Sequence, residues 1–487
     1  MLRISSAASG LLALLLLGGC ASDGGQRTHA VMRDPASLAA RAALDGRAVS
    51  PAAWPSATWY ARYGDAQLDA LIAEALAANP GLRIAEARVR QAAALGEVAG
   101  ASLTPQIAAS ERTARQLFSA NSTVPKPLAG NWAWSNDASV NLSYEFDFWG
   151  KNQASLEAAI GRRHAAEVES QAARLMLAVA ISQAYLRLSQ SWAQGDLAAA
   201  VVQQREHLLR LTAERVRAHL DSAVDQKQAE LAVPLAREQV AAIDEAIALG
   251  RFQLAALLGA GPDRGAAIAR PALRTVTVSA AALPTNLPSE LLARRPDVVA
   301  QRWRVEAAAR DIEVAKAQFY PSFNLGALIG LQSLGFDRFL AAGSRVSGAS
   351  AALNLPIFDG GRLRGALGAR QAEYDAAVEQ YNLTLVDALR DVVSQLASIT
   401  ALQQRAALQA EALAAARQAH ALSLQRYQAG VGNYLQVLST DLQVLSLERA
   451  GIDFAARAFD LDIALVRALG GGYTDGATDS LQLSSAR

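Results

Sequence analysis

Apolar and polar residues alternate along four short segments of the chain, and this period of two predicts β-strands. The clearest segment reads SVNLSYEFDFW, in which one face carries Val140, Leu142, Tyr144, Phe146 and Phe148. The other predicted strands run over residues 106–118, 323–332 and 349–357. Each segment is about as long as the ~9–11 residues with which a tilted strand crosses a bilayer.

Longer stretches repeat their apolar residues at helical spacing. One stripe ahead of Pro80 comprises Leu68, Leu71, Ile72, Ala75 and Leu76. A helical run begins after Gly150 and meets no proline until Pro234, and a second begins after Gly361 and contains none. Each run breaks once, at residues 218–225 and 429–435. A helix over residues 151–218 would be about 100 Å long, at roughly 1.5 Å per residue. The pattern therefore predicts two long helical hairpins.

The second half of the chain repeats the first. Ahead of the strands, a shift of 216 residues places Pro80 on Pro296, and in the helical part a shift of 211 places Gly150 on Gly361. The difference predicts a longer first strand loop, around residues 119–136. Copies of this size exceed the ~20–50 residues of solenoid units. We expect a first repeat at 61–269, a connector at 270–289, a second repeat at 290–470 and a C-terminal tail at 471–487.

The N-terminus has the pattern of a bacterial export signal that ends in a lipidation site. Arg3 precedes the apolar run GLLALLLLGG, and LGGC ends at Cys20, the only cysteine of the chain. A single thiol in an exported protein has no disulfide partner, which favours lipidation over an ordinary signal peptide with an incidental cysteine. We expect a signal peptide at 1–19 and a lipid-anchored tether at 20–60. Ala21 and Ser22 favour sorting to the outer membrane.

Composition and charge narrow the classes of function. The 46 lysines and arginines balance the 45 aspartates and glutamates, so the sequence offers no basic field for nucleic acid. The 52% hydrophobic fraction comes largely from alanine, which favours long helices packed side by side. The histidines lack metal-binding spacing, and no catalytic motif is present, so we expect neither an enzyme nor a cofactor besides the lipid. They are His29, His164, His207, His219 and His420.

Four strands cannot close a membrane barrel on their own. Open edges in lipid leave backbone donors and acceptors unpaired, at several kcal/mol each, and membrane barrels begin at about eight strands. Three copies would supply twelve strands and twelve helices, enough for a tube with a lumen. Alternation alone also fits a soluble sandwich, but aromatic residues near the strand ends, such as Tyr144, Trp149 and Tyr320, favour a membrane.

Several motifs resemble those of the outer membrane factor family, the trimeric exit ducts of tripartite efflux pumps and type I secretion systems. The motifs are LPSELLARRPDVVAQRWRVEAAARDIEVAKAQFYPSF, YEFDFWGKNQASLEAA, LPIFDGGRLRGAL and RYQAGVGNYLQVL. The chain is most similar to the lipidated drug-efflux branch. The resemblance implies an α+β membrane protein whose trimer forms a twelve-stranded outer membrane β-barrel, continuous with a twelve-helix periplasmic α-barrel and a mixed equatorial belt. It also implies three partners: outer membrane lipid, a periplasmic adaptor and an inner-membrane pump of the RND type.

The resemblance further implies a gate at the periplasmic end. By position the family's constricting leucine falls on Leu435, and Tyr427 matches a tyrosine that ties the closed tip to its neighbour. Gly432 occupies the place of that tyrosine's basic partner, so no such partner is expected. Gln436 and Ser439 occupy the places of the family's aspartates. The remaining candidates for gate charges are Asp441, Asp225 and Glu230, and all of these residues could instead be ordinary coiled-coil residues.

The adaptor is expected to contact the two hairpin turns through Ala218, Leu220, Ser222, Gly430, Gly432 and Asn433. The function implied is passive conduction of small molecules, such as antibiotics, out of the cell. Two alternatives are a type I protein-secretion channel, which the lipidation motif disfavours, and a periplasmic coiled-coil adaptor lipoprotein. The duplicated strands fit the second alternative poorly. The sequence leaves the substrate range open.

Overall fold

The structure is a computed structural model that describes residues 25, 27–38, 54–274 and 294–474. Cys20 with the signal peptide, part of the tether, most of the connector and the end of the tail lie outside the described residues. The chain divides into two compact units. One comprises Met1–Met32, Arg88–Glu167 and Ala300–Asn382, and the other comprises Arg33–Ala87, Val168–Val299 and Leu383–Arg487. Each unit therefore draws on both halves of the chain.

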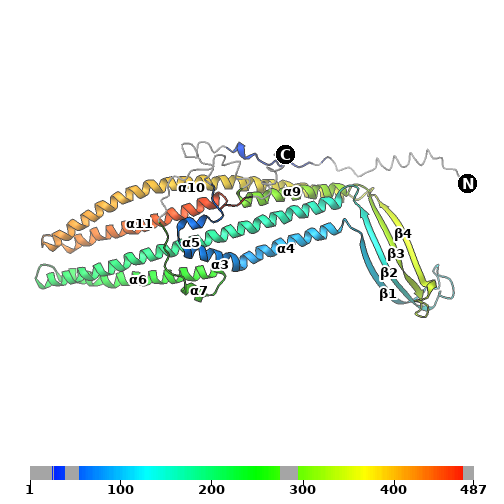
Figure 1. The fold of residues 1–487 in the computed structure, drawn as a ribbon, viewed down its shortest axis with the longest axis horizontal. Helices are drawn as coiled ribbons and strands as arrows, with labels where there is room; N and C mark the ends of the chain where they lie inside the picture. Colours follow the sequence, from blue (N-terminus) through cyan, green and yellow to red (C-terminus); the bar gives the residue numbers. More distant parts are fainter. Residues whose placement is uncertain (1–24, 26, 39–53, 275–293, 475–487) are drawn as a thin grey trace. The chain divides into compact units, whose positions relative to one another are not determined.

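The first unit contains a four-stranded antiparallel sheet in the order β1-β2-β3-β4 (Figure 1). Its strands are β1 (Gln106–Leu117), β2 (Trp132–Phe146), β3 (Ser322–Leu334) and β4 (Arg345–Asn354). Each strand pairs with its neighbour in the sequence, and β2 pairs with β3 over Ser135–Phe146. The two repeats thus contribute one hairpin each and join into a single sheet at β2 and β3.

Two strand boundaries differ from the sequence prediction. β2 begins at Trp132, inside the expected loop, and ends at Phe146, so Phe148 lies past its end. β4 begins at Arg345 and ends at Asn354 rather than reaching residue 357. Pro356 has no backbone N–H to donate to the sheet, which accounts for the earlier end of β4.

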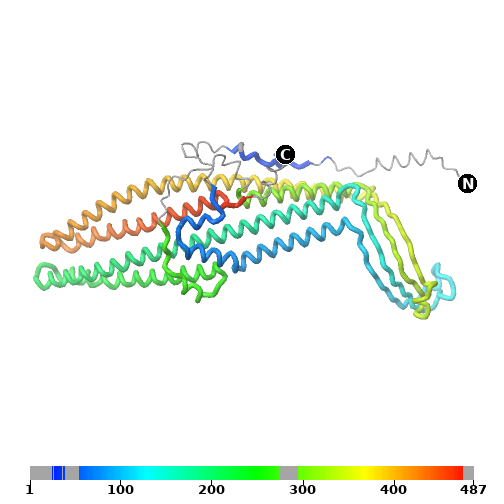
Figure 2. Tube along the Cα trace, in the orientation of Figure 1, coloured from blue at the N-terminus to red at the C-terminus, as the bar shows by residue number. Residues whose placement is uncertain are grey.

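Long helices make up most of the rest of the described chain. They are α4 (Pro80–Ala101), α5 (Lys151–Arg217), α6 (Ala223–Leu258), α9 (Pro296–Ala317), α10 (Arg362–Gln428) and α11 (Tyr434–Ala468). Shorter elements are α3 (Ala66–Ala78), α7 (Pro262–Ala266), η1 (Pro35–Ser37), η3 (Trp59–Tyr63) and η4 (Ala342–Ser344). Both predicted hairpins are present, α5 with α6 in green and α10 with α11 in orange (Figure 2).

Within the described residues, no helix is both long enough and apolar enough to cross a membrane.

At equivalent positions in the two repeats, a side chain donates a hydrogen bond to a backbone carbonyl, although the residue types differ. In the first repeat, Asn79 Nδ2 donates to the carbonyl of Leu257 at 2.7 Å. In the second, Arg295 Nη1 donates to the carbonyl of Ala468 at 3.4 Å. Asn79 plus 216 is Arg295, and Leu257 plus 211 is Ala468. Each contact ties the start of one helix to the end of a hairpin helix, where carbonyl groups lack partners within the helix.

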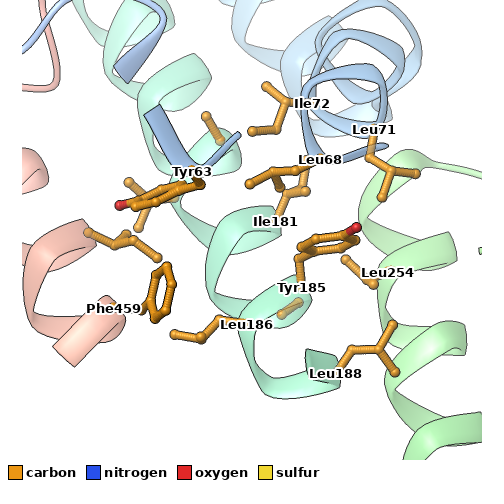
Figure 3. Close-up of a cluster of buried hydrophobic side chains, with 14 of the residues drawn as sticks. Tyr63, Leu68, Leu71, Ile72, Ile181, Tyr185, Leu186, Leu188, Leu254 and Phe459 are labelled. Atoms are coloured by element: carbon orange, nitrogen blue, oxygen red, sulfur yellow. The ribbon is translucent and has the colours of Figure 1, made fainter. Parts of the chain in front are cut away.

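The core of the second unit collects apolar side chains from η3, α3, α5, α6 and α11 (Figure 3). Tyr63 packs against Phe459 with ring centroids 5.6 Å apart. Tyr185 donates its hydroxyl to Asp65 at 2.7 Å, and Asp65 also caps α3 by accepting from the Gln67 backbone. The cluster joins residues of both repeats, because Phe459 comes from α11 and Tyr185 from α5.

Candidate functional site

The register of the sheet sorts its side chains onto two faces, because residues paired across antiparallel strands point the same way. One row reads Ile107, Leu142, Ala327 and Ala349. The next row on that face reads Ala109, Val140, Ile329 and Ser347. We call it the apolar face. The alternate positions, which include Ser139 and Asn141 of β2, form the polar face.

Aromatic rings lie near both ends of the apolar face. At the loop end Trp134 contacts Phe336 with centroids 5.4 Å apart, and at the helix end Tyr144 and Phe146 are 4.9 Å apart. From Trp134 to Tyr144, β2 runs for ten residues, or roughly 34 Å. A strand tilt of about 40° reduces this to a height of roughly 26 Å, close to the ~25 Å apolar band of outer membrane strands. Not every row between these rings is apolar, because Glu111 and Arg345 lie level with Ala138 and Leu331 on this face. The aromatic rings at both ends and the apolar rows near the helix end are the features that suit a lipid-facing surface.

The polar face carries small and hydrophilic side chains. They include Gly326, Gly330, Gly348, Ser139, Ser143, Ser350 and Asn141. Arg112 of β1 lies directly opposite Asp137 of β2, so one charge of each sign meets at that level. Such a face suits a water-filled passage that exerts little electrostatic selection on what passes.

The turns of the two helical hairpins have the same construction. His219 follows α5 with a φ of 60°, and Gly430 follows α10 with a φ of 78°. His219 plus 211 is Gly430, so the two residues occupy equivalent left-handed positions. The second helices start at matching caps, where Ser222 accepts from Asp225 N at 3.3 Å and Asn433 accepts from Gln436 N at 2.9 Å. Asp225 thus serves a capping box rather than a free charge.

Each turn exposes a pair of aliphatic side chains. Leu220 and Val224 flank the first turn, and Val431 and Leu435 flank the second, with exposed fractions between 60% and 69%. The shift of 211 places Leu220 on Val431 and Val224 on Leu435. Apolar residues exposed at the same two places in both repeats indicate a contact surface. All four residues lie within the two turns, 218–224 and 429–435, at which the sequence predicts the adaptor contact.

A polar network beside these turns centres on Tyr427. The ring of Tyr427 is buried, and its hydroxyl donates to Asp221 and lies 3.1 Å from Thr212 Oγ1. Arg215 binds Asp221 through Nε and Nη2, at 2.9 and 3.1 Å, and its guanidinium lies 4.3 Å from the Tyr427 ring centroid. Nη1 of Arg215 also donates to the Tyr427 carbonyl at 2.6 Å. The network joins α10 to α5 and to the turn that follows it.

Burial and pairing shift the acidity of this network. Burial, together with the hydrogen bond to Asp221, raises the pKa of Tyr427 to about 12. Burial alone would raise the pKa of Asp221, but the hydrogen bonds from Arg215 and Tyr427 outweigh it and hold that pKa below its usual value. The carboxylate and the neutral phenol therefore persist together at neutral pH.

The expectation that Tyr427 lacks a basic partner is wrong within the single chain, because Arg215 supplies one from α5. Sequence reasoning missed both Arg215 and Asp221. A signal was present, since Asp221 plus 211 is Gly432. The first turn therefore carries an acidic residue at the place equivalent to Gly432, and the basic partner, Arg215, comes from α5.

The predicted acidic residues of the gate do not gather in the described chain. Asp441 is buried, with 2% of its side chain exposed, and Arg205 Nη2 lies 2.5 Å from its Oδ2. Glu230 lies 2.6 Å from Lys227, whose hydrogen bond holds the Glu230 pKa below its usual value. Asp441 therefore pairs with Arg205 instead of presenting a free charge beyond Leu435. The remaining turn residues, Ala218, Gly430 and Gly432, lie at the hairpin ends as expected.

Comparison with known proteins identifies the family. A profile described as "Outer membrane efflux protein" matches residues 71–260 and 287–471. The fusaric acid resistance protein FusA of Burkholderia cepacia is 41% identical over 377 residues, covering 76% of this chain and 71% of FusA. The multidrug resistance outer membrane protein MdtP of Escherichia coli K12 is 32% identical over 438 residues, covering 87% of this chain and 88% of MdtP.

Solved structures share the fold. The outer membrane protein VceC of Vibrio cholerae matches with a TM-score of 0.80 and 38% identity, over 86% of this chain and 100% of VceC. The Campylobacter jejuni CmeC outer membrane channel has a TM-score of 0.80 at 20% identity, over 89% of this chain and 92% of CmeC, and so supports the fold alone. These matches confirm the predicted fold, the resemblance and the outer membrane location. The family is one of channels rather than enzymes, and this chain belongs to the outer membrane efflux protein family.

Proposed function

We propose that the chain works as a homotrimer and forms the outer membrane exit channel of a tripartite pump. The supporting observation is a sheet with one apolar face and two edge strands, β1 and β4, that have one strand partner each among the described residues. Unpaired edges are not tolerated in lipid. Three copies provide twelve strands if β4 of each copy pairs with β1 of the next, and the polar faces then line the passage.

The gate of this channel is assigned to the hairpin turns. Leu435 stays exposed in the single chain, and in a ring of three its side chain would narrow the passage. Replacing Leu435 with alanine should raise the single-channel conductance of purified protein in planar bilayers. Leu422→Ala, at another exposed leucine of the same unit, serves as the control. Equal conductance in both variants would remove Leu435 from the gate.

The partners follow from the same turns. The aliphatic pairs at Leu220, Val224, Val431 and Leu435 offer the apolar contact that a periplasmic adaptor needs, and an inner-membrane pump of the RND type would supply the energy. Docking can open a closed channel only if the adaptor prefers the open form. The passage itself is passive.

The substrates proposed are small organic toxins. FusA is named for fusaric acid resistance and MdtP for multidrug resistance. Deletion of the gene should lower the inhibitory concentration of several drugs or of fusaric acid, and the wild-type gene should restore it. Unaltered susceptibility across the panel would contradict an efflux role. A Cys20→Ser variant tests the lipid anchor. If Cys20 is lipidated, this variant should no longer incorporate labelled palmitate.

A further inference from the structure

A short segment of the tether lies against α10, and both belong to the first compact unit. Both carboxylate oxygens of Asp375 accept from the backbone N–H of His29, at 3.0 and 3.1 Å. Oδ1 of Asp375 also accepts from the N–H of Ala30 at 3.0 Å. Asn382 of α10 donates its side-chain amide to the carbonyl of Val31 at 3.1 Å. We call these two α10 residues, Asp375 and Asn382, the tether clamp.

The clamp holds the tether by its backbone. All of these hydrogen bonds use main-chain atoms of the tether, and Val31 itself is 77% exposed. Hydrogen bonds to an ionised carboxylate are stronger than those between neutral groups, and Asn382 is buried. The two clamp residues lie roughly 10 Å apart along the helix axis, a distance that about three residues of extended chain match. The clamp therefore fixes one point of the tether on α10.

The direction and length of the tether relate this point to the sheet. His29 contacts Asp375 and Val31 contacts Asn382, so the N-terminal side of the tether points towards the start of α10. That start, Arg362, lies beside the helix end of the sheet, because it lines the same pocket as residues 322 and 354. At about 1.5 Å per residue, Asp375 lies roughly 20 Å along α10 from Arg362. The chain from His29 back to residue 20 can reach about 30 Å at most.

We propose that the tether clamp sets how far the lipid on Cys20 can extend from the fold. The acyl chains then enter the membrane at the helix end of the sheet, where Tyr144 and Phe146 form an aromatic border. The reach of the tether exceeds the distance to the start of α10 by only about 10 Å. The lipid is therefore held beside the sheet of its own chain. The proposal rests on the lipidation of Cys20, which is part of the proposed function.

Hydrogen–deuterium exchange of the full-length protein in lipid nanodiscs tests the clamp. The amides of His29 and Ala30 should exchange about tenfold or more slowly than in a free peptide, because their acceptor is a charged group. Asp375→Ala should abolish this protection. Glu373→Ala, in an exposed pair with Arg370 on the same helix, should preserve it. Slow exchange within α10 shows that each variant is folded, and equal protection of His29 and Ala30 in both variants would overturn the clamp.

A shortened tether tests whether the clamp limits the lipid. Deletion of residues 23–27 leaves a reach of about 14 Å from residue 20 to His29, less than the roughly 20 Å to the start of α10. A lipid in the membrane should then pull the tether off the clamp, so that His29 and Ala30 exchange quickly. The same deletion combined with Cys20→Ser should keep their exchange slow. Slow exchange in both proteins, or fast exchange in both, would overturn the limit set by the clamp.

Palmitate incorporation and conductance of the same preparations separate this proposal from the proposed function. A lipidated, conducting protein whose His29 and Ala30 amides ignore Asp375→Ala contradicts the clamp alone. Missing palmitate contradicts the lipidation and with it the limit on the lipid, even if both amides are protected. Protected amides in a lipidated protein that does not conduct contradict the channel and leave the clamp in place.

Discussion

At the scale of single residues, the contacts of Tyr427 show how a hairpin turn is held without a large apolar core. The hydrogen bond from the Tyr427 hydroxyl to Asp221 requires a charged carboxylate and a neutral phenol. The pKa of Asp221 lies below its usual value and that of Tyr427 lies at about 12. Both forms therefore coexist across the physiological range, and a pH change within that range leaves the network intact.

The sign of each pKa shift predicts two limits of stability. The lowered pKa of Asp221 means that its stabilisation is complete above about pH 4 and is lost as the pH falls through the lower folded value. The raised pKa of Tyr427 means that its stabilisation is complete below about pH 10 and is lost as the pH rises through about 12. Thermal unfolding midpoints measured from pH 3 to pH 12 should fall at both ends.

Asp221→Asn checks the acid limit. Removing one partner of a buried ion pair costs about 3–5 kcal/mol, and the Arg215 and Asp221 side chains are only 8% and 7% exposed. The variant should melt at a lower temperature, conduct more and lose the fall in stability near pH 4. A variant that melts like the wild type at neutral pH would show that the network carries no stability.

At His219, unlike Asp221, we expect a substitution that raises the stability of the fold. A non-glycine residue in the left-handed region costs about 1–2 kcal/mol, partly offset by the greater entropy loss of glycine on folding. His219→Gly should therefore stabilise the chain by roughly 0.5–1 kcal/mol, seen as a higher unfolding midpoint. Gly430→His, the mirror exchange at the equivalent position, should destabilise it. A lower midpoint for His219→Gly would mean that the imidazole makes a contact worth more than the strain.

At the scale of elements, the periodic segments were predictable and the specific contacts were not. β3 follows the alternation of its sequence, β1 does so clearly only at Ile107 and Ala109, and α5 ends at Arg217 directly before the predicted break. Arg205 looks like an ordinary helix-surface arginine, because its partner Asp441 belongs to the other hairpin. Arg215 pairs with Asp221 of its own hairpin, but its contact with the Tyr427 carbonyl depends on how the two hairpins pack. A hydrophobic period of 2 or 3.6 residues can be read from neighbouring residues. An ion pair between the two hairpins joins residues that are distant in the sequence and depends on the folded structure.

The two faces of the sheet make a sharp prediction from adjacent residues. Val140 lies on the apolar face and Asn141 on the polar face of β2. An arginine on the lipid side near the middle of a bilayer costs about 2–4 kcal/mol. Val140→Arg should therefore reduce assembled, heat-modifiable protein in the outer membrane, while Asn141→Arg should assemble and shift ion selectivity towards anions. The reverse result would exchange the two faces.

At the scale of the whole molecule, assembly depends on the edges β1 and β4. In a Cys20→Ser background, a cysteine at Ala109 of β1 combined with one at Ala349 or Ser347 of β4 should crosslink one copy to the next and give a trimer that resists boiling in SDS. Cysteines at Val140 and Ile329, which pair within one sheet, should crosslink only within the chain. Exclusive intrachain products from the β1 and β4 cysteines would contradict closure by neighbours.

The pairing of β2 with β3 also has a consequence for how the protein is made. Phe146 of β2 pairs with Phe323 of β3, which lies 177 residues further along the chain. Ser135 pairs with Leu334, which lies 199 residues further along. Contacts so distant in sequence form slowly. During export, the β1–β2 hairpin therefore keeps the edge of β2 unpaired until β3 of the second repeat has been exported. A periplasmic chaperone that covers the unpaired edge of β2 would therefore favour insertion into the membrane over aggregation of the unfolded chain.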